Sequence, residues 1–231
     1  VTYNHLGKYH CPNCGYERPA LDDAVEAILE MKPYGSKVII NKEEYTISQA
    51  GLYNIYNALC AYSIGEALAI DHTIIKDVLE NQESRFGRQE VIQLEDKKMT
   101  IFLVKNPAGF NQTIDTIALD QEPFTCLFML NDRYADGTDV SWIYDVHLEN
   151  LAKLPIKEYI IGGIRAYDMA VRLKIATGKS DHLNVYEDYE AITKAVLAAP
   201  TPHVYATLTY TAMLEYRKYL ENAGYIKDYW R

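Results

Sequence analysis

Residues 100–109 read Thr-Ile-Phe-Leu-Val-Lys-Asn-Pro-Ala-Gly, an apolar run that passes directly into a short polar turn. The run Thr100–Val104 is typical of a buried β-strand. Pro107 suits the first turn of a helix, where a backbone N–H is not needed. Strand and helix patterns alternate in this way through the rest of the chain. The alternation predicts right-handed crossovers and a mainly parallel sheet in a Rossmann-like α/β domain.

Six strands and four helices are expected in this part of the chain. The strands are Val91–Leu94, Thr100–Val104, Phe124–Leu130, Glu158–Ile161, Leu183–Tyr186 and His203–Leu208. The helices are Ala108–Leu119, Arg165–Ala176, Tyr189–Ala198 and Thr211–Asn222. Ligands of parallel sheets bind at the carboxyl ends of the strands. The loops that follow these strands are therefore the candidate functional segments.

Two of these loops offer groups that suit phosphate. Lys105 and Asn106 follow the strand Thr100–Val104, and a lysine beside a helix N-terminus can hold a phosphate. An ordinary loop lysine before a helix is the alternative. The pair Gly162-Gly163 allows close backbone approach, but by itself it is more typical of a tight turn.

A third loop is rich in acids. It follows Phe124–Leu130 and contains Asp132, Asp136, Asp139 and Asp145. A carboxylate in this position can bind a metal, orient a histidine or act as a base. The Asp136-Gly137 pair also suits a plain turn. The apolar stretch between Asp139 and Asp145 is unusual for a solvated loop and favours a functional role.

The region before residue 89 has a different pattern. Two short strands, Lys37–Ile40 and Glu44–Ile47, flank a tight hairpin, and residues 25–31 fit either a strand or a helix. The segments Leu52–Ile70 and Ile74–Asn81 show helical spacing, with Asp71 or Thr73 as the cap of the second.

Residues 83–88 are polar and irregular, which predicts a linker and a boundary near Arg88. The helix Leu52–Ile70 carries Asn54 and Asn57 on one face. Paired amides there could read the edge of a base such as adenine, and a merely polar helix face is the alternative.

A cysteine knuckle lies near the start of the chain. Cys11-Pro12-Asn13-Cys14-Gly15 has the spacing that aims two thiolates at one metal ion. A tetrahedral zinc needs four ligands, and the remaining cysteines, Cys60 and Cys126, lie in distant apolar runs. The single knuckle and the initial valine predict that the chain is a fragment with the first knuckle upstream.

Composition limits the classes of function that the chain can have. The net charge of −9 argues against general nucleic-acid binding, which needs a basic surface. No apolar run is long enough to span a bilayer. Four cysteines without a disulfide framework suit the reducing cytoplasm. The 20 tyrosines are compatible with a protein partner or with a tyrosine-rich core.

Several motifs together resemble one family. Residues 51–59 resemble the Gly-x-His-Asn-x-x-Asn-Ala helix of Mur ligases, and residues 86–90 resemble their Gly-Arg-x-Glu hinge. Residues 105–107 stand where Mur ligases carry His-Asn-Pro. The cysteine knuckle and the longer segments 136–145 and 165–174 make the chain similar to the MurT family, the Mur-ligase-like subunits of lipid II isoglutaminyl synthase.

The resemblance implies a fold and an activity. Residues 1–88 would be part of a Mur-ligase central ATPase domain with half of a zinc ribbon at 1–18, and residues 89–231 a Rossmann-like C-terminal domain. The synthase would use ATP, with Mg, to amidate the D-glutamate α-carboxylate of lipid II through an acyl phosphate, and Zn would be bound by the ribbon. Ammonia would come from a GatD-type glutaminase subunit in a heterodimer, in the cytoplasm or at the inner face of the membrane.

The resemblance also assigns residues. Asn57, with Asn54 beside it, would contact adenine, and Arg88, Lys105 and Asn106 would lie on the nucleotide. Asp139, with Asp136 and Asp145 as alternatives, would complete the partner's Cys–His pair as a triad acid. Cys11 and Cys14 would bind zinc.

Some positions depart from the pattern of the family. Tyr53 replaces the histidine of the helix motif, and Phe102 stands where Mur ligases often carry an acid. The sequence contains neither a P-loop nor a second Cys-x-x-Cys, so the chain by itself is expected to be inactive. A Mur-type amino-acid ligase and a non-catalytic Rossmann-like binding module are the two alternative functions.

Overall fold

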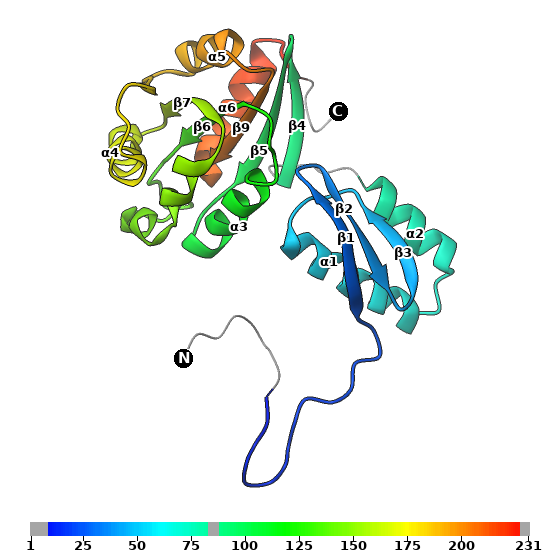
Figure 1. The fold of residues 1–231 in the computed structure, drawn as a ribbon. Coiled ribbons are helices and arrows are strands. Elements are labelled where there is room, and N and C mark those ends of the chain that lie inside the picture. Colours follow the sequence, from blue (N-terminus) through cyan, green and yellow to red (C-terminus); the bar gives the residue numbers. More distant parts are fainter. Residues whose placement is uncertain (1–8, 83–87, 227–231) are drawn as a thin grey trace.

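The computed structural model describes residues 9–82 and 88–226, and it contains two sheets (Figure 1). The first sheet is antiparallel, with the order β1-β2-β3. Its strands are β1 (Val25–Lys32), β2 (Gly35–Ile40) and β3 (Glu43–Ile47). Helices α1 (Leu52–Ala67) and α2 (His72–Asn81) pack against it. Residues 25–31, whose sequence fits either a strand or a helix, therefore belong to a strand.

Local backbone geometry explains the turns that connect β2 to β3 and α1 to α2. Asn41 and Lys42 both have positive φ, 47° and 72°, between the paired residues Ile40 and Glu43. Two such residues are typical of the type I′ hairpin turn, whose twist matches that of the strands. The helix predicted to reach Ile70 instead ends at Ala67, and the left-handed backbone of Ala69 (φ 54°) reverses the chain. Asp71, one of the two predicted caps, accepts the Thr73 N–H at 2.8 Å and begins α2.

The second sheet has six strands in the order β4-β5-β9-β6-β7-β8. They are β4 (Arg88–Leu94), β5 (Lys97–Leu103), β6 (Phe124–Met129), β7 (Ile156–Gly162), β8 (Leu183–Val185) and β9 (His203–Leu208). Only the edge strand β4 runs antiparallel to its neighbour, so the prediction of a mainly parallel sheet is confirmed.

Helices cover both faces of this sheet. On one face lie α3 (Pro107–Ile117), α4 (Ala166–Thr177) and the short 3-10 helices η1 (Ser141–Asp145) and η2 (Leu148–Lys153). On the other lie α5 (Tyr189–Ala198) and α6 (Tyr210–Asn222). All four predicted helices are present. Strand β6 is completely buried because both of its faces are covered, which explains its unbroken apolar run.

The chain joins its two sheets at the start of β4. Most of the predicted linker, residues 83–87, lies outside the described residues, and Arg88 is already in β4. The next residue, Gln89, is buried and has a left-handed backbone (φ 63°) at a register shift between β4 and β5. Such a conformation is uncommon for a residue with a side chain and needs compensating contacts.

The Gln89 carboxamide provides those contacts. Its Nε2 donates to the Ala50 carbonyl at 2.6 Å and to the Tyr53 hydroxyl at 2.8 Å, and its Oε1 accepts the Ala50 N–H at 2.8 Å. One side chain thus satisfies both backbone groups of a fully buried residue at the start of α1. The adjacent Gly51 (φ 92°) leaves no room for a Cβ, which would lie 2.5 Å from Thr116 Oγ1 on α3.

We predict that Gln89→Leu lowers the free energy of unfolding by about 2 kcal/mol, because it leaves the buried N–H of Ala50 without a partner and removes one of the two donors to its C=O. Chemical denaturation followed by circular dichroism measures the change. The matched control is Gln93→Leu on the exposed side of the same strand, for which a change within about 0.5 kcal/mol is expected. Equal stabilities of the two variants would contradict the role given to Gln89.

Candidate functional site

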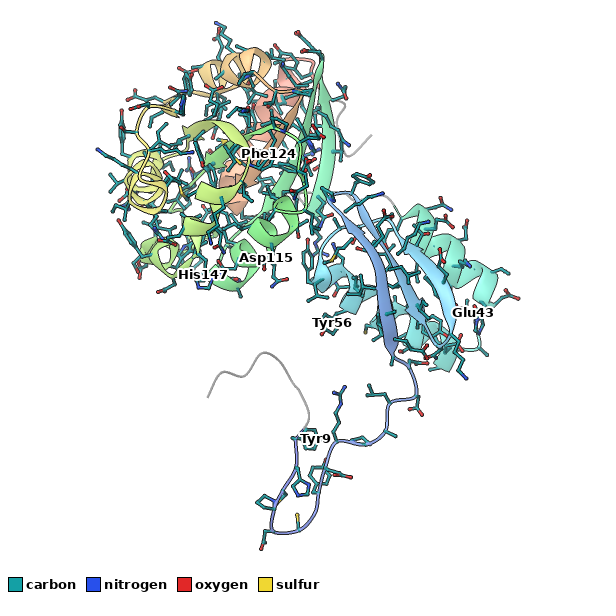
Figure 2. The ribbon with its side chains drawn as sticks, in the orientation of Figure 1. Tyr9, Glu43, Tyr56, Asp115, Phe124 and His147 are labelled. Atoms are coloured by element: carbon teal, nitrogen blue, oxygen red, sulfur yellow. The ribbon has the colours of Figure 1, made fainter. Side chains whose placement is uncertain are left out.

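A cleft of about 950 Å³ lies between the first sheet with its helices and the carboxyl end of β5. Helix α1, which carries Tyr56, faces α3, which carries Asp115, across this junction (Figure 2). The lining residues are Ile47, Ser48, Gln49, Tyr53, Asn54, Asn57, Ala58, Ala61, Leu79, Gln82, Arg88, Phe102, Leu103, Lys105, Asn106, Ala108, Gly109, Gln112 and Thr113. Its volume is in the range of small-ligand sites, about 300–1,000 Å³.

The cleft brings together five residues that are far apart in the sequence. Asn54, Asn57, Arg88, Lys105 and Asn106 all line it. These are the residues that the sequence assigned to a nucleotide. The geometry gathers them into one concave surface, and it places the candidate acids Asp136, Asp139 and Asp145 elsewhere.

The charge of the cleft is unlike that of the chain. The chain has 32 acidic residues and a net charge of −9. None of the described residues that line the cleft is acidic, whereas Arg88 and Lys105 are both cationic. Since an acid-free surface with two cations attracts anions, the cleft is suited to a phosphate-bearing ligand.

The two asparagines of α1 have different surroundings. Asn54 is buried; its Nδ2 donates to the Ala50 carbonyl at 2.8 Å and its Oδ1 accepts from Asn57 Nδ2 at 3.2 Å. Asn57 is exposed to the cleft. Asn54 therefore holds the amide of Asn57 in place, and Asn57 retains hydrogen-bonding capacity for a ligand.

The loop after β5 is shaped by a helix cap. Asn106 Oδ1 accepts the Gly109 N–H at 2.8 Å, and Pro107 occupies the first turn of α3. The side-chain oxygen of Asn106 is thus used by the helix, while Lys105 is exposed at the cleft. The cap fixes the direction in which the loop leaves β5.

The structure also accounts for the two departures from the Mur-ligase pattern. Tyr53 accepts a hydrogen bond from Gln89, so it belongs to the contact that joins the two parts of the chain. Phe102 is buried, with its ring 6.2 Å from that of Tyr205. A carboxylate at position 102 would lie in this apolar surrounding.

The four acids of the acid-rich loop have different surroundings, and Asp132 is half-buried and pairs with Arg165 at 2.9 Å. Asp136 is buried and accepts both the N–H (2.8 Å) and the hydroxyl of Thr211, which caps the start of α6. Asp139 is exposed and accepts the Ser141 N–H at 2.8 Å, which lowers the pKa of its carboxyl. Asp145 is also exposed, at the end of η1.

No sequence motif marks the roles of two residues that organise the cleft junction and the loop after β6. Gln89 is one, and Asn131 is the other: its side chain donates to Thr211 Oγ1 and accepts the Ile164 N–H, both at 2.9 Å. Gly163 is required by the backbone packing at this turn, since a Cβ there would lie 2.6 Å from the Leu130 carbonyl oxygen. Only the position of Gln89 within the hinge motif could have drawn attention to it.

The cysteine segment forms a knuckle. The Cys11 N–H donates to the Tyr16 carbonyl at 2.7 Å. Gly15, which has a left-handed backbone, donates its N–H to the Cys11 carbonyl at 3.0 Å. Backbone N–H groups of Cys14 and then Asn13 point at the Cys11 sulfur and lower the pKa of its thiol. A lowered pKa favours the metal-binding thiolate. Within the described residues no group of three or more His, Cys, Asp or Glu forms a metal site.

Among the described residues, no helix combines the length and the apolar character needed to cross a bilayer.

The solved structures that resemble the chain define its class. MurF from Acinetobacter baumannii superimposes with a TM-score of 0.66 at 18% identity, over 87% of this chain and 45% of that one. Folylpolyglutamate synthase from Mycobacterium tuberculosis, complexed with ADP and AMPPCP, gives 0.62 at 15%, over 86% and 47%. At such identities the likeness concerns the fold alone, and that fold is the Mur-ligase α/β fold.

The particular family follows from the sequence matches. Residues 103–213 match the family model described as MurT ligase C-terminal. The MurT subunit of lipid II isoglutaminyl synthase (glutamine-hydrolyzing) from Streptococcus pneumoniae is 38% identical over 226 residues. That alignment covers 98% of this chain and 51% of the relative. The chain belongs to the MurT family, and it spans about half the length of the curated relatives it matches.

We predict that Asp136→Ala lowers the free energy of unfolding by about 1–2 kcal/mol, because α6 loses a capping acceptor. Asp139→Ala is expected to have a smaller effect, since Asp139 is exposed and caps only the five-residue η1. Urea unfolding of both variants tests the difference. A larger loss from Asp139→Ala would contradict the structural role of Asp136.

Proposed function

We propose that the chain is part of an ATP-dependent, amide-forming ligase that converts the D-glutamate α-carboxylate of lipid II to D-isoglutamine. The ammonia would come from glutamine, hydrolysed by a GatD-type glutaminase subunit. One observation carries the nucleotide part of the proposal: Asn57, Arg88 and Lys105 gather in a cleft whose described lining contains no acidic residue, in a chain of net charge −9. The MurT relatives, named as subunits of a glutamine-hydrolysing synthase, support the rest.

In this proposal the cleft binds the nucleotide along its length. Asn57, held by Asn54, recognises the edge of the adenine. Arg88 and Lys105 neutralise the phosphates, and the Asn106 cap keeps the N-terminal turn of α3 beside them. ATP, when bound, supplies the phosphoryl group that turns the carboxylate into an electrophile. The solved relative with ADP and AMPPCP supports a nucleotide in this fold.

The two metals of the proposal differ in how well these residues fit them. Mg²⁺ prefers carboxylate, phosphate and water oxygens, and none of the described residues that line the cleft is acidic. The described lining of the cleft therefore offers no carboxylate ligand for Mg²⁺, and we assign the ion no residue here. Cys11 and Cys14 fit zinc, because a knuckle with a lowered thiol pKa is a half-site. They would supply two of four ligands, and the described residues offer no further pair beside them.

We assign the role of partner-directed acid to Asp139. Its carboxylate is exposed and oriented by Ser141. A triad acid has to reach a histidine, hold its tautomer and stabilise its charged form. Asp136 is occupied by the cap of α6, and Asp145 is the remaining exposed alternative.

The proposal includes the division of the chain at Arg88. Residues 1–88 would belong to the central ATPase domain and residues 89–231 would form the C-terminal domain. With lipid II as the substrate, the reaction would take place in the cytoplasm or at the inner face of the membrane.

We expect Lys105→Ala to weaken ADP binding by at least tenfold in the full-length protein, because a phosphate loses its counter-charge. Isothermal titration calorimetry measures the dissociation constant. Lys98→Ala, an exposed lysine near the opposite end of β5, is the matched control and should bind like the unmodified protein. An unchanged affinity of Lys105→Ala would remove Lys105 from the site.

We expect Asp139→Asn to reduce glutamine hydrolysis by at least a hundredfold in the complex with the glutaminase, while the complex itself stays intact. The amide keeps the size of the side chain and loses the charge that stabilises a protonated histidine. Asp145→Asn is the matched control, with near-normal hydrolysis. Normal hydrolysis by Asp139→Asn would show that the acid is another residue, and loss in Asp145→Asn alone would transfer the role.

A further inference from the structure

A second cavity, of about 1000 Å³, lies at the junction between the two parts of the chain. Gln89 lines it, whereas the preceding residue, Arg88, lines the cleft. Ser48, directly after β3, lines both. The junction at Gln89 therefore separates two cavities of similar size, and only one of them is used by the proposed function.

The walls of the second cavity come from both parts of the chain. One wall is the two-residue turn Pro33-Tyr34, which joins the paired residues Lys32 and Gly35 of β1 and β2 and lies beside β4 (Figure 1). The other wall belongs to the second sheet and is formed mainly by residues 119–123, which connect α3 to β6. A change in the angle between the two parts would therefore change the width of this cavity.

Exposed apolar groups lie on both walls. Tyr34, at the tip of the turn, is 67% exposed, and Val91 on β4 is 53% exposed. Pro123 and Pro202 are also exposed and line the same cavity. Because removal of apolar surface from water is favourable, these groups favour a state in which the cavity is closed and Tyr34 packs on the opposite wall.

The charges of the two walls are also complementary. The connection 119–123 has two carboxylates, Asp120 and Glu122, and no cation, whereas the turn follows Lys32. Asp120 is held in place: its Oδ2 accepts the Tyr205 hydroxyl at 2.8 Å and lies 3.4 Å from His203 Nδ1. Its Oδ1 accepts the Glu122 N–H at 3.1 Å. The opposite wall is thus a fixed surface on which the turn can dock.

We propose that the turn Pro33-Tyr34 is a latch that docks on the connection 119–123 and holds the cleft open. Gln89 acts as the pivot, so a rotation that closes the second cavity widens the cleft on the other side of the junction. A nucleotide that contacts Asn57 on one wall of the cleft and Lys105 on the other favours the opposite rotation and releases the latch. This coupling to the nucleotide rests on the proposed function.

The structure of the junction suits a pivot. Hinges are usually a few residues at the ends of elements that absorb changes in backbone angles. Gln89 is such a residue, with a left-handed backbone beside a register shift near the start of β4. Its bonds to Ala50 and Tyr53 come from one side chain, so they hold the two parts together at a point. The ring of Pro33 stiffens the turn, which moves with its sheet as one body.

A disulfide tests whether the latch docks. In the full-length protein, Tyr34→Cys and Gln121→Cys can be joined only when the cavity is closed, because a disulfide needs Cα atoms within about 7 Å. We expect this pair to link under oxidation without ligand and saturating ADP to slow the linking at least fivefold. The control pair is Tyr34→Cys with Lys179→Cys, an exposed position after α4 that should not link. Mass spectrometry of peptides identifies the linked residues.

The linked protein tests the coupling to the cleft. Its affinity for ADP, measured by calorimetry, should be at least tenfold lower than that of the unmodified protein, and reduction of the disulfide should restore it. Unchanged affinity in the linked state would show that the latch and the cleft are independent.

A further measurement reports on the latch without any nucleotide. Tyr56 and Asp115 lie on the two helices that face each other at the cleft (Figure 2). Tyr56→Cys and Asp115→Cys, in a Cys60→Ser background, are joined by a short bismaleimide more often when the cleft is narrow. Adding Tyr34→Ala should speed this reaction at least threefold, because the latch loses its apolar contact. Tyr134→Ala is the control, since Tyr134 is 96% exposed and lies outside both cavities.

These measurements separate the latch from the proposed function. If residues 34 and 121 link no faster than the control pair, or if Tyr34→Ala leaves the reaction across the cleft unchanged, the latch is wrong even where ADP binds as expected. If both reactions behave as predicted and ADP neither binds nor changes them, the latch is supported and the nucleotide assignment of the cleft is overturned.

Discussion

The cleft of this protein depends on one carboxamide. Gln89 lies at the point where the chain passes from its first sheet to its second. Its side chain bonds both the N–H and the C=O of Ala50, as the backbone of a neighbouring strand would. The contact is buried, so breaking it would leave polar groups without partners in an apolar surrounding. Gly51 permits the approach of α1 to Thr116 of α3. Every proposed nucleotide contact requires this junction, since α1 carries Asn57 and β5 leads to Lys105.

The cleft is also defined by the charges it excludes. Acidic residues are abundant in the chain, yet the described lining of the cleft contains none. The position at which Mur ligases often carry an acid is Phe102, packed near Tyr205. Position 102 is thus occupied by a buried aromatic residue, and the described lining contains cations but no carboxylate. The proposed binding of a phosphate-bearing ligand therefore rests on the type of residue at position 102 as well as on Arg88 and Lys105.

The sequence predicted what is local and missed what is distant. Apolar periodicity predicted the strands and helices of the second sheet, because apolar residues follow the repeat of the element that contains them. Motifs located Asn54, Asn57, Arg88, Lys105 and Asn106, but the roles of Asn54 and Asn106 as supports needed the structure. The Gln89 and Asp136 contacts join residues 39 and 75 positions apart, and no local pattern encodes them. The end of α1 depends on the left-handed backbone of Ala69, a conformation that the helix propensity of alanine does not predict.

Strand order explains why the proposed nucleotide site and Asp139 lie apart. Strand β9 is inserted between β5 and β6, so the loops that leave these two consecutive strands are separated at the carboxyl edge of the sheet. The β5 loop borders the cleft with Lys105, and the β6 loop leads away to Asp139 and, through Arg172, to α4. Asn131 and Asp136 both bind Thr211 at the start of α6, the helix after β9. The start of α6, directly after the strand that separates β5 from β6, therefore holds the first part of the β6 loop in place.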